Sequence, residues 1–137
     1  MAALGAHEQA RALDEDTFVR RRRILGDDHP DTLDLASNLA IRLAALGEYE
    51  QARALDEDAF IRYRRILGED HPHTLTSANN FARDLAALGK YEQARILDED
   101  TLTRRRRILG EDHPYTLASA DNFTRDLVAL GKHERAH

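Results

Sequence analysis

Residues 68–89 read GEDHPHTLTSANNFARDLAALG and contain a complete helix with its own start and stop signals. Pro72 suits the first helical position, where its missing N–H leaves no hydrogen bond unmade. Gly89 suits the left-handed position that follows a helix. Between them, apolar residues recur at steps of three and four, as on one face of an amphipathic helix: Leu75, Ala78, Phe81, Ala82, Leu85 and Leu88.

A second helical pattern follows after a short connection, from about Tyr91 to Leu109, and Gly110 ends it. Such a short connection makes the two helices antiparallel neighbours. We call the first pattern helix A and the second helix B. The apolar face of helix B carries Tyr91, Ala94, Leu97, Leu102 and Ile108, and its counterpart one copy earlier carries Tyr49, Ala52, Leu55, Phe60 and Ile66.

The helical pair belongs to a repeat of 42 residues, because the seven glycines of the chain are spaced every 21 residues. The units are 5–46, 47–88 and 89–130, and residues 131–137 begin a partial fourth unit. A fixed period of this size is typical of solenoids, in which stacked hairpins bury faces that one hairpin cannot bury alone. The sequence therefore predicts one all-α solenoid over residues 1–137.

Composition excludes several classes of protein. The chain has no cysteine, a net charge of −5 and 33% charged residues, which disfavours disulfides, thiol chemistry and general binding of nucleic acid. Evenly spaced glycines fit no phosphate-binding loop. No stretch is long and apolar enough to span a membrane. The first residues lack a basic-then-apolar pattern, so we expect no secretory signal. We expect a cytoplasmic protein that needs no cofactor and contacts no membrane.

Three short segments carry a resemblance to a known family: ANNFA at 78–82, LGKYEQA at 88–94 and LGEDHP at 109–114. They resemble the 42-residue tetratricopeptide repeat of the kinesin-light-chain type, as in the long arrays of actinobacterial proteins. The resemblance implies a right-handed superhelix that binds a protein or peptide on the concave wall formed by helices A. It implies no catalysis in the repeats.

The chain departs from the family pattern in the middle of helix B. Asp14, Asp56 and Asp98 replace an aromatic residue, and Thr17 and Thr101 replace a small alanine. Histidines also replace the family tyrosine at positions 7 and 133. These changes question how tightly helices A and B pack, and leave the predicted fold intact.

The inward-facing positions of the family predict a peptide-binding groove. Asn38, Asn80 and Asn122 form a ladder whose amides can bind the backbone of an extended peptide. Arg83 and Arg125 could hold an acidic group by a forked contact. Alternatively, the asparagines hold neighbouring helices together and the arginines are ordinary solvated charges. The predicted groove comprises Ser37, Asn38, Ile41, Asn79, Asn80, Arg83, Asp121, Asn122 and Arg125.

Arginine runs recur near the end of each helix B: Arg20 to Arg23, Arg62 with Arg64 and Arg65, and Arg104 to Arg107. Positive charge there complements the helix dipole, and an aspartate four residues before each run can form an ion pair. No aromatic residues alternate with the arginines for base stacking. We therefore favour a structural role over binding of nucleic acid.

Histidines and serines also recur with the repeat. His29, His71 and His113 lie on the order of 10 Å or more apart, too far to share a metal ion. Each sits in an Asp-His-Pro motif that fits a turn and helix start. A catalytic group is normally unique in a chain, whereas Ser77 and Ser119 occupy the same position of successive repeats. We expect neither a metal site nor an enzyme.

The two ends of the sequence stand out from the repeat. Residues 1–5 match only the last residues of a helix A, and the chain closes six residues into a helix B. We expect an internal part of a longer array. An alternative function is self-assembly, in which the ends of two molecules associate head-to-tail and residues 131–137 move aside.

Overall fold

The structure is a computed structural model that describes the backbone of residues 2–136 and the side chains of residues 5–132. The described residues form six α-helices joined by short turns, and no strand occurs among them. This architecture confirms the predicted all-α class. The helices are α1 (Ala2–Leu25), α2 (Pro30–Ala45), α3 (Tyr49–Leu67), α4 (Pro72–Ala87), α5 (Tyr91–Leu109) and α6 (Pro114–Ala136).

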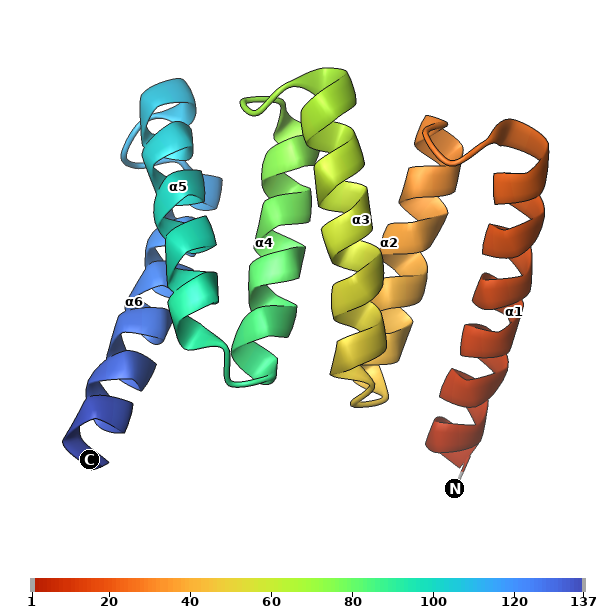
Figure 1. The fold of residues 1–137 in the computed structure, drawn as a ribbon, viewed down its shortest axis with the longest axis horizontal. Helices are drawn as coiled ribbons and strands as arrows, with labels where there is room; N and C mark the ends of the chain where they lie inside the picture. The colour runs from red at the N-terminus through yellow and green to blue at the C-terminus, as the bar shows by residue number, and fades with distance from the viewer. Residues whose placement is uncertain (1, 137) are drawn as a thin grey trace.

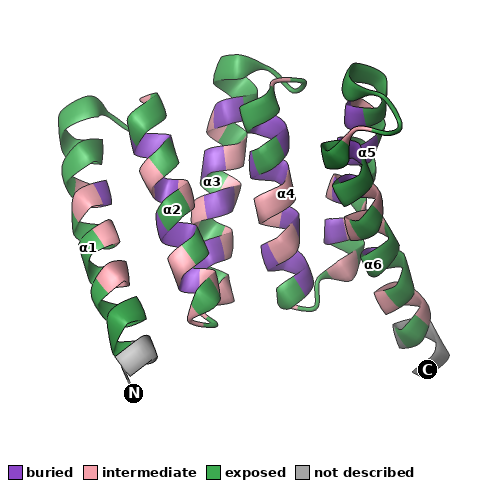
Figure 2. Ribbon diagram, turned by 180° about the vertical axis from the view of Figure 1, so that it is seen from behind, coloured by how far each residue is buried: buried purple, intermediate pink, exposed green. Residues whose placement is uncertain are grey.

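The helices form a solenoid in which each helix packs against the next helix in the chain (Figure 1). Helices α2, α4 and α6 are the predicted helices A, and α1, α3 and α5 are the predicted helices B. Ala40, Ala52, Ala82 and Ala94 are fully buried between neighbours. Figure 2 shows the buried residues on the sides where helices face one another. Small side chains at these positions let the helix backbones approach closely.

Glycine ends each interior helix A because the chain there turns into the next helix B. Gly47 and Gly89 have φ values of 80° and 79°, which side-chain-bearing residues rarely adopt. The N–H of Gly47 donates to the carbonyl of Ala44, and the N–H of Glu48 donates to that of Leu43. These bonds satisfy carbonyl groups that the helix end would leave unpaired.

The last helix differs from this expectation. Helix α6 continues through Gly131 to Ala136, so residues 131–136 prolong this helix A instead of beginning the separate helix B that the repeat predicts. Helix α1 likewise begins at Ala2 and includes Gly5. At Gly47 and Gly89 the turn is held by a helix that packs back on its predecessor, and no such helix follows Gly131 among the described residues. Glycine permits the turn but does not impose it.

Histidine starts each helix A, as the Asp-His-Pro motif predicts. The Nδ1 atoms of His29, His71 and His113 each accept a hydrogen bond from the backbone N–H two residues later, at 3.0–3.1 Å. In α2 and α4 the following proline occupies the first helical turn. The histidine side chain therefore takes the capping role more often filled by Ser, Thr, Asp or Asn.

His71→Ala should lower the free energy of unfolding by about 0.5–2 kcal/mol, because it removes this cap. His71→Asn keeps a side-chain acceptor at the same position and should retain most of the stability. Urea denaturation followed by circular dichroism measures both variants. Equal loss in the alanine and asparagine variants would contradict a capping role.

Candidate functional site

We call the surface that carries the nine predicted groove residues the A-face. These residues lie on α2, α4 and α6, the successive helices A. Two hollows open on this surface, one between α2 and α4 and one between α4 and α6. Six of the nine predicted residues line one hollow or the other.

The α2–α4 hollow has a volume of about 370 Å³ and is lined mostly by polar residues. The hydroxyl of Tyr63 donates to Oδ1 of Asp34 at 3.3 Å. Burial and the charge of Asp34 raise the pKa of Tyr63 to about 12, so the hydroxyl keeps its proton. The Oγ atom of Ser77 is buried without a hydrogen-bond partner. The lining residues are Asp34, Ser37, Asn38, Ile41, Tyr63, His73, Thr76, Ser77 and Asn80.

The α4–α6 hollow is larger, about 740 Å³, and combines positive charge with apolar surface. Arg83, Arg125 and Lys132 supply the charge. Long cationic side chains beside a weakly polar floor suit a ligand that carries both an acidic and an apolar group. The remaining lining residues are Ala86, Ala87, Tyr91, Val128 and Ala129.

The two arginines of this hollow are not free solvated charges. Nη2 of Arg125 lies 3.0 Å from Asp126 and 3.2 Å from Asp98. Arg83 has the same position one repeat earlier, 3.4 Å from Asp84. Each arginine side chain is still 40% exposed. The guanidinium groups thus stabilise buried acids on one side and retain donors toward the hollow on the other.

The buried acids form pairs that join a helix B to the next helix A. Asp56 on α3 faces Asp84 on α4, and Asp98 on α5 faces Asp126 on α6; all four are at most 2% exposed. Desolvation is the largest cause that raises the pKa of Asp56 to about 9 and that of Asp98 to about 8. The hydrogen bond and charge of the partner carboxyl group are the next largest causes. Each pair therefore holds a proton at neutral pH, since two ionised carboxylates in contact repel one another.

The first repeat solves the same packing problem with an ion pair. Arg42 stands at the position of Asp84, and its Nε lies 3.2 Å from Oδ2 of Asp14. The sequence singles out Asp14, Asp56 and Asp98 as departures from the family, but not their partners. The signal is present as a spacing of 28 residues between partners. The family aromatic is thus replaced by paired polar groups, and Ala52 and Ala94 still pack closely beside them.

The asparagine ladder splits into two roles. Nδ2 of Asn122 on α6 donates to Oδ1 of Asn79 on α4, so this pair ties neighbouring helices together. Asn38 and Asn80 line the α2–α4 hollow, and neither forms a side-chain hydrogen bond among the described residues. Asp121 is exposed and lines neither hollow. The structure thus supports the alternative role for Asn79 and Asn122 and leaves Asn38 and Asn80 available to a ligand.

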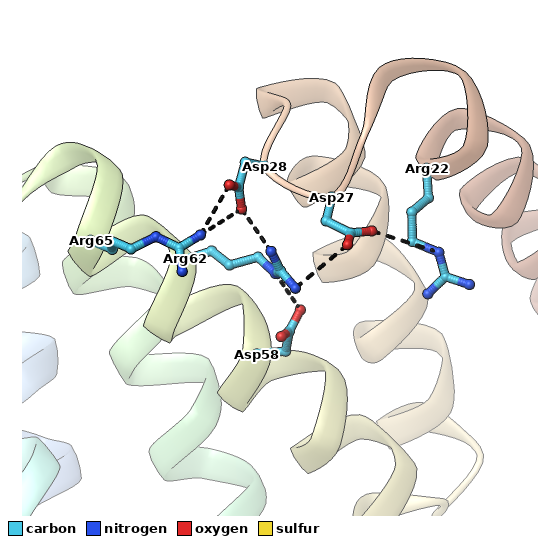
Figure 3. A network of polar contacts seen from close by, with 6 residues as sticks. All are labelled: Arg22, Asp27, Asp28, Asp58, Arg62 and Arg65. Atoms are coloured by element: carbon cyan, nitrogen blue, oxygen red, sulfur yellow. Dashed lines mark hydrogen bonds and ion pairs between the residues drawn. The ribbon is translucent and has the colours of Figure 1, made fainter.

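The arginine runs bind the loops that precede the previous helix A (Figure 3). Arg62 and Arg65 both contact Asp28, at 2.7 and 2.9 Å. Arg104 and Arg107 contact Asp70 in the same way, both at 2.7 Å. We call each such set a repeat clamp. These contacts lower the pKa values of Asp28 and Asp70.

The predicted ion pairs within helix B also form. Asp16–Arg20, Asp58–Arg62 and Asp100–Arg104 each have a separation of 2.9 Å. Sequence reasoning missed the clamps because they connect residues 34 and 37 positions apart, across two helices.

One arginine of the third run is buried instead. Nη1 of Arg105 donates to Oγ of Ser119 at 3.0 Å and to the carbonyl of Tyr115 at 3.3 Å. Its guanidinium lies over the Tyr115 ring, 5.3 Å from the centroid. Tyr63 holds the equivalent position one repeat earlier. Ser77 and Ser119 share one repeat position but have different surroundings, since Ser119 binds Arg105 while Ser77 lines the α2–α4 hollow. Ser37 lies at another repeat position and lines that hollow too.

Two further observations concern the described residues. No group of three or more histidine or acidic side chains among them is arranged to hold a metal ion. No described helix is long and apolar enough to cross a membrane.

Comparison with known proteins gives one family and a consistent fold. The Tetratricopeptide repeat family model matches residues 1–60, 35–106 and 79–137. The kinesin light chain TPR-like repeats of Podosopora anserina are 28% identical, with a TM-score of 0.88. A single-substitution variant of those repeats has a TM-score of 0.84 at the same identity. Among curated protein sequences, none matches the chain.

A third structure, BtubC (BKLC) from P. vanneervenii, is 19% identical with a TM-score of 0.83, a likeness of fold alone. The similar region covers 98% of this chain for both Podosopora structures and 96% for BtubC. The same region covers only 64% of the length of each Podosopora chain and 53% of the length of the BtubC chain.

Proposed function

The chain belongs to the tetratricopeptide repeat family, and from this premise we propose that it is a non-enzymatic scaffold that binds an extended protein segment along its A-face. Repeats of this family generally serve as scaffolds for protein–protein interaction. The observation that carries the proposal is the pair of hollows on successive helices A, lined by six of the predicted groove residues.

The chemistry of the hollows favours a particular kind of segment. The free amides of Asn38 and Asn80 can bind backbone N–H and C=O groups of an extended chain. The exposed sides of Arg83 and Arg125 favour a carboxylate, and the surface around Tyr91 favours an apolar side chain. We therefore expect an extended segment in which an acidic residue stands close to an apolar one.

Asn38→Ala combined with Asn80→Ala should weaken binding of such a segment about tenfold, the effect of losing one or two hydrogen bonds. The probe is a synthetic peptide selected from a displayed library of random peptides on the immobilised chain, and fluorescence anisotropy gives its Kd. Helicity and melting temperature should stay near those of the unmodified chain. Selected peptides should be enriched in acidic and apolar residues.

The matched control is Asn79→Ala combined with Asn122→Ala, which removes two amides that bind each other between α4 and α6. This control should lower the melting temperature more than the first variant does. An unchanged Kd for the Asn38 and Asn80 variant would overturn the proposed binding surface.

A further inference from the structure

We infer that a second copy of this chain docks its α1 against the outer side of α6, in the register that α3 keeps on α2 and α5 keeps on α4. The occupant is thus a helix B, presented to a helix A that has no following helix B among the described residues. This surface is separate from the A-face, and the inference goes beyond peptide binding.

The α6 side of this interface is an apolar surface that the equivalent interior helices bury. Leu127 is 45% exposed, whereas its counterparts Leu43 and Leu85 are 3% and 2% exposed. Thr124 is exposed where Ala40 and Ala82 are fully buried. We call the set the α6 stripe; it comprises Leu117, Thr124 and Leu127.

Leu117 forms the part of the stripe near the N-terminal end of α6, and its counterpart in the first repeat indicates which residues should cover it. It is 53% exposed, whereas its counterpart Leu33 is 3% exposed and packs in one cluster with Ala59 and Tyr63 of α3. On α1, Thr17 holds the repeat position of Ala59, and Arg21 holds that of Tyr63. Helix α5 already carries the same two residue types there, and both are buried.

The α1 side offers the complementary apolar residue. Leu13 is 66% exposed. Its counterparts Leu55 and Leu97 are partly buried, and each packs against the core cluster that contains Leu43 or Leu85. In the same register, Leu13 of a second copy meets Leu127. Figure 2 shows the outer flank of α1 largely exposed.

Charge complementarity selects a copy of this chain as the occupant. Arg20 and Arg23 stand on α1 where Arg62 and Arg65 stand on α3, the arginines that clamp Asp28. Asp112 holds the position of Asp28 in the loop before α6, and it forms no ion pair within the described side chains. Docking in register therefore completes a third repeat clamp, between Asp112 of one molecule and Arg20 and Arg23 of the next.

The backbone at the two ends leaves room for this contact. Residues 131–136 prolong the axis of α6, so they do not occupy the place of a following helix B. In Figure 1, the start of α1 and the end of α6 both lie on the lower side of the view, at opposite ends of the row of helices. A docked α1 can run antiparallel to α6 along its whole length. Because the contact is head-to-tail, further copies can add to each end.

Light scattering on a sizing column, across a hundredfold range of concentration of the 137-residue chain, tests this inference. The mass should rise above 15.6 kDa as concentration increases. Arg20→Asp with Arg23→Asp should remain monomeric, and so should Asp112→Arg, because each creates like charges at the clamp. An equimolar mixture of these two variants should associate again, because at each mixed contact residue 112 of one variant meets opposite charges at positions 20 and 23 of the other.

Two controls separate this contact from others. Asp121→Arg changes the net charge as Asp112→Arg does, but on the A-face, and should leave association intact. Leu127→Asp should abolish association, because it places a charge where Leu13 of the next copy packs. Adding either charge variant should not make Leu127→Asp molecules associate with one another. Circular dichroism at low concentration establishes that each variant is folded. A constant mass for the unmodified chain, or no recovery on mixing, would overturn the inference without affecting peptide binding.

Discussion

Raising the pH from about 5 to about 9 should destabilise the folded chain steadily. The pKa values of Asp56 and Asp98 are raised from 3.8 to about 9 and about 8, so the folded state keeps protons that the unfolded state releases. The stability that these groups contribute is fully present below pH 3.8, falls progressively as the pH rises above it, and is lost once the pH passes the folded-state values. For each proton that the folded state retains and the unfolded state releases, the free energy of unfolding falls by about 1.4 kcal/mol per pH unit.

The repeat clamps act in the opposite direction and at lower pH. Asp28 and Asp70 have lowered pKa values, so their contribution is present above pH 3.8 and is lost as the pH falls below it. The free energy of unfolding should therefore pass through a maximum in mildly acidic solution. Urea titrations at a series of pH values, followed by circular dichroism, give this profile.

The first repeat supplies a matched control for the pH effect. Arg83→Ile with Asp84→Arg gives the second repeat the residues of Ile41 and Arg42, so that Asp56 faces an arginine as Asp14 does. This exchange should remove the contribution of one acid pair and leave that of Asp98 and Asp126. The slope of stability against pH should fall by about half, since one of two retained protons is lost. An unchanged slope would contradict proton sharing in the pair.

Leu85→Ala should lower the free energy of unfolding by about 2–5 kcal/mol, the range for removing a fully buried leucine. Leu85 lies on α4, 2% exposed, in the cluster with Ala82, Ala86 and Ala94 that joins α4 to α5. The cavity left there would weaken the middle of the stack, where each repeat depends on its neighbours. Chemical denaturation of the dilute protein measures the loss.

Leu127→Ala is the control, because the same residue at the same repeat position is 45% exposed on α6. It should cost less than about 1 kcal/mol in dilute protein, as surface substitutions usually do. Comparable losses in the two variants would mean that the outer side of α6 is already covered under those conditions. If copies stack as inferred, the cost of Leu127→Ala should grow with protein concentration.

The sequence predicts the fold well because each local signal recurs in all three repeats. Periodic apolar residues, Pro72 and Gly89 define the hairpin, and the 42-residue period defines the stack. Gly131 shows the limit of this reasoning, since the same residue type is helical where no packed helix follows it. A local signal predicts a turn only when the tertiary contacts that hold the turn are present.

The candidate site is predictable only in part. Positions of the groove residues follow from the repeat, but their partners depend on the register between helices. The acid pair of Asp56 with Asp84 and the clamp of Arg62 with Asp28 both cross from one helix to another. The sequence shows those residues recurring, while only the packed structure shows that Asn79 binds Asn122 and that Asn80 does not.

The repeat clamps also shape how the chain should fold and yield to force. They bridge 34 to 37 residues, and the most distant side-chain hydrogen bond among the described residues bridges 43. Chains dominated by such near contacts fold fast, and solenoids can nucleate at any repeat and grow outward. A molecule pulled by its two ends should therefore lose its helices one after another from the outside, lengthening in small steps rather than in one rupture.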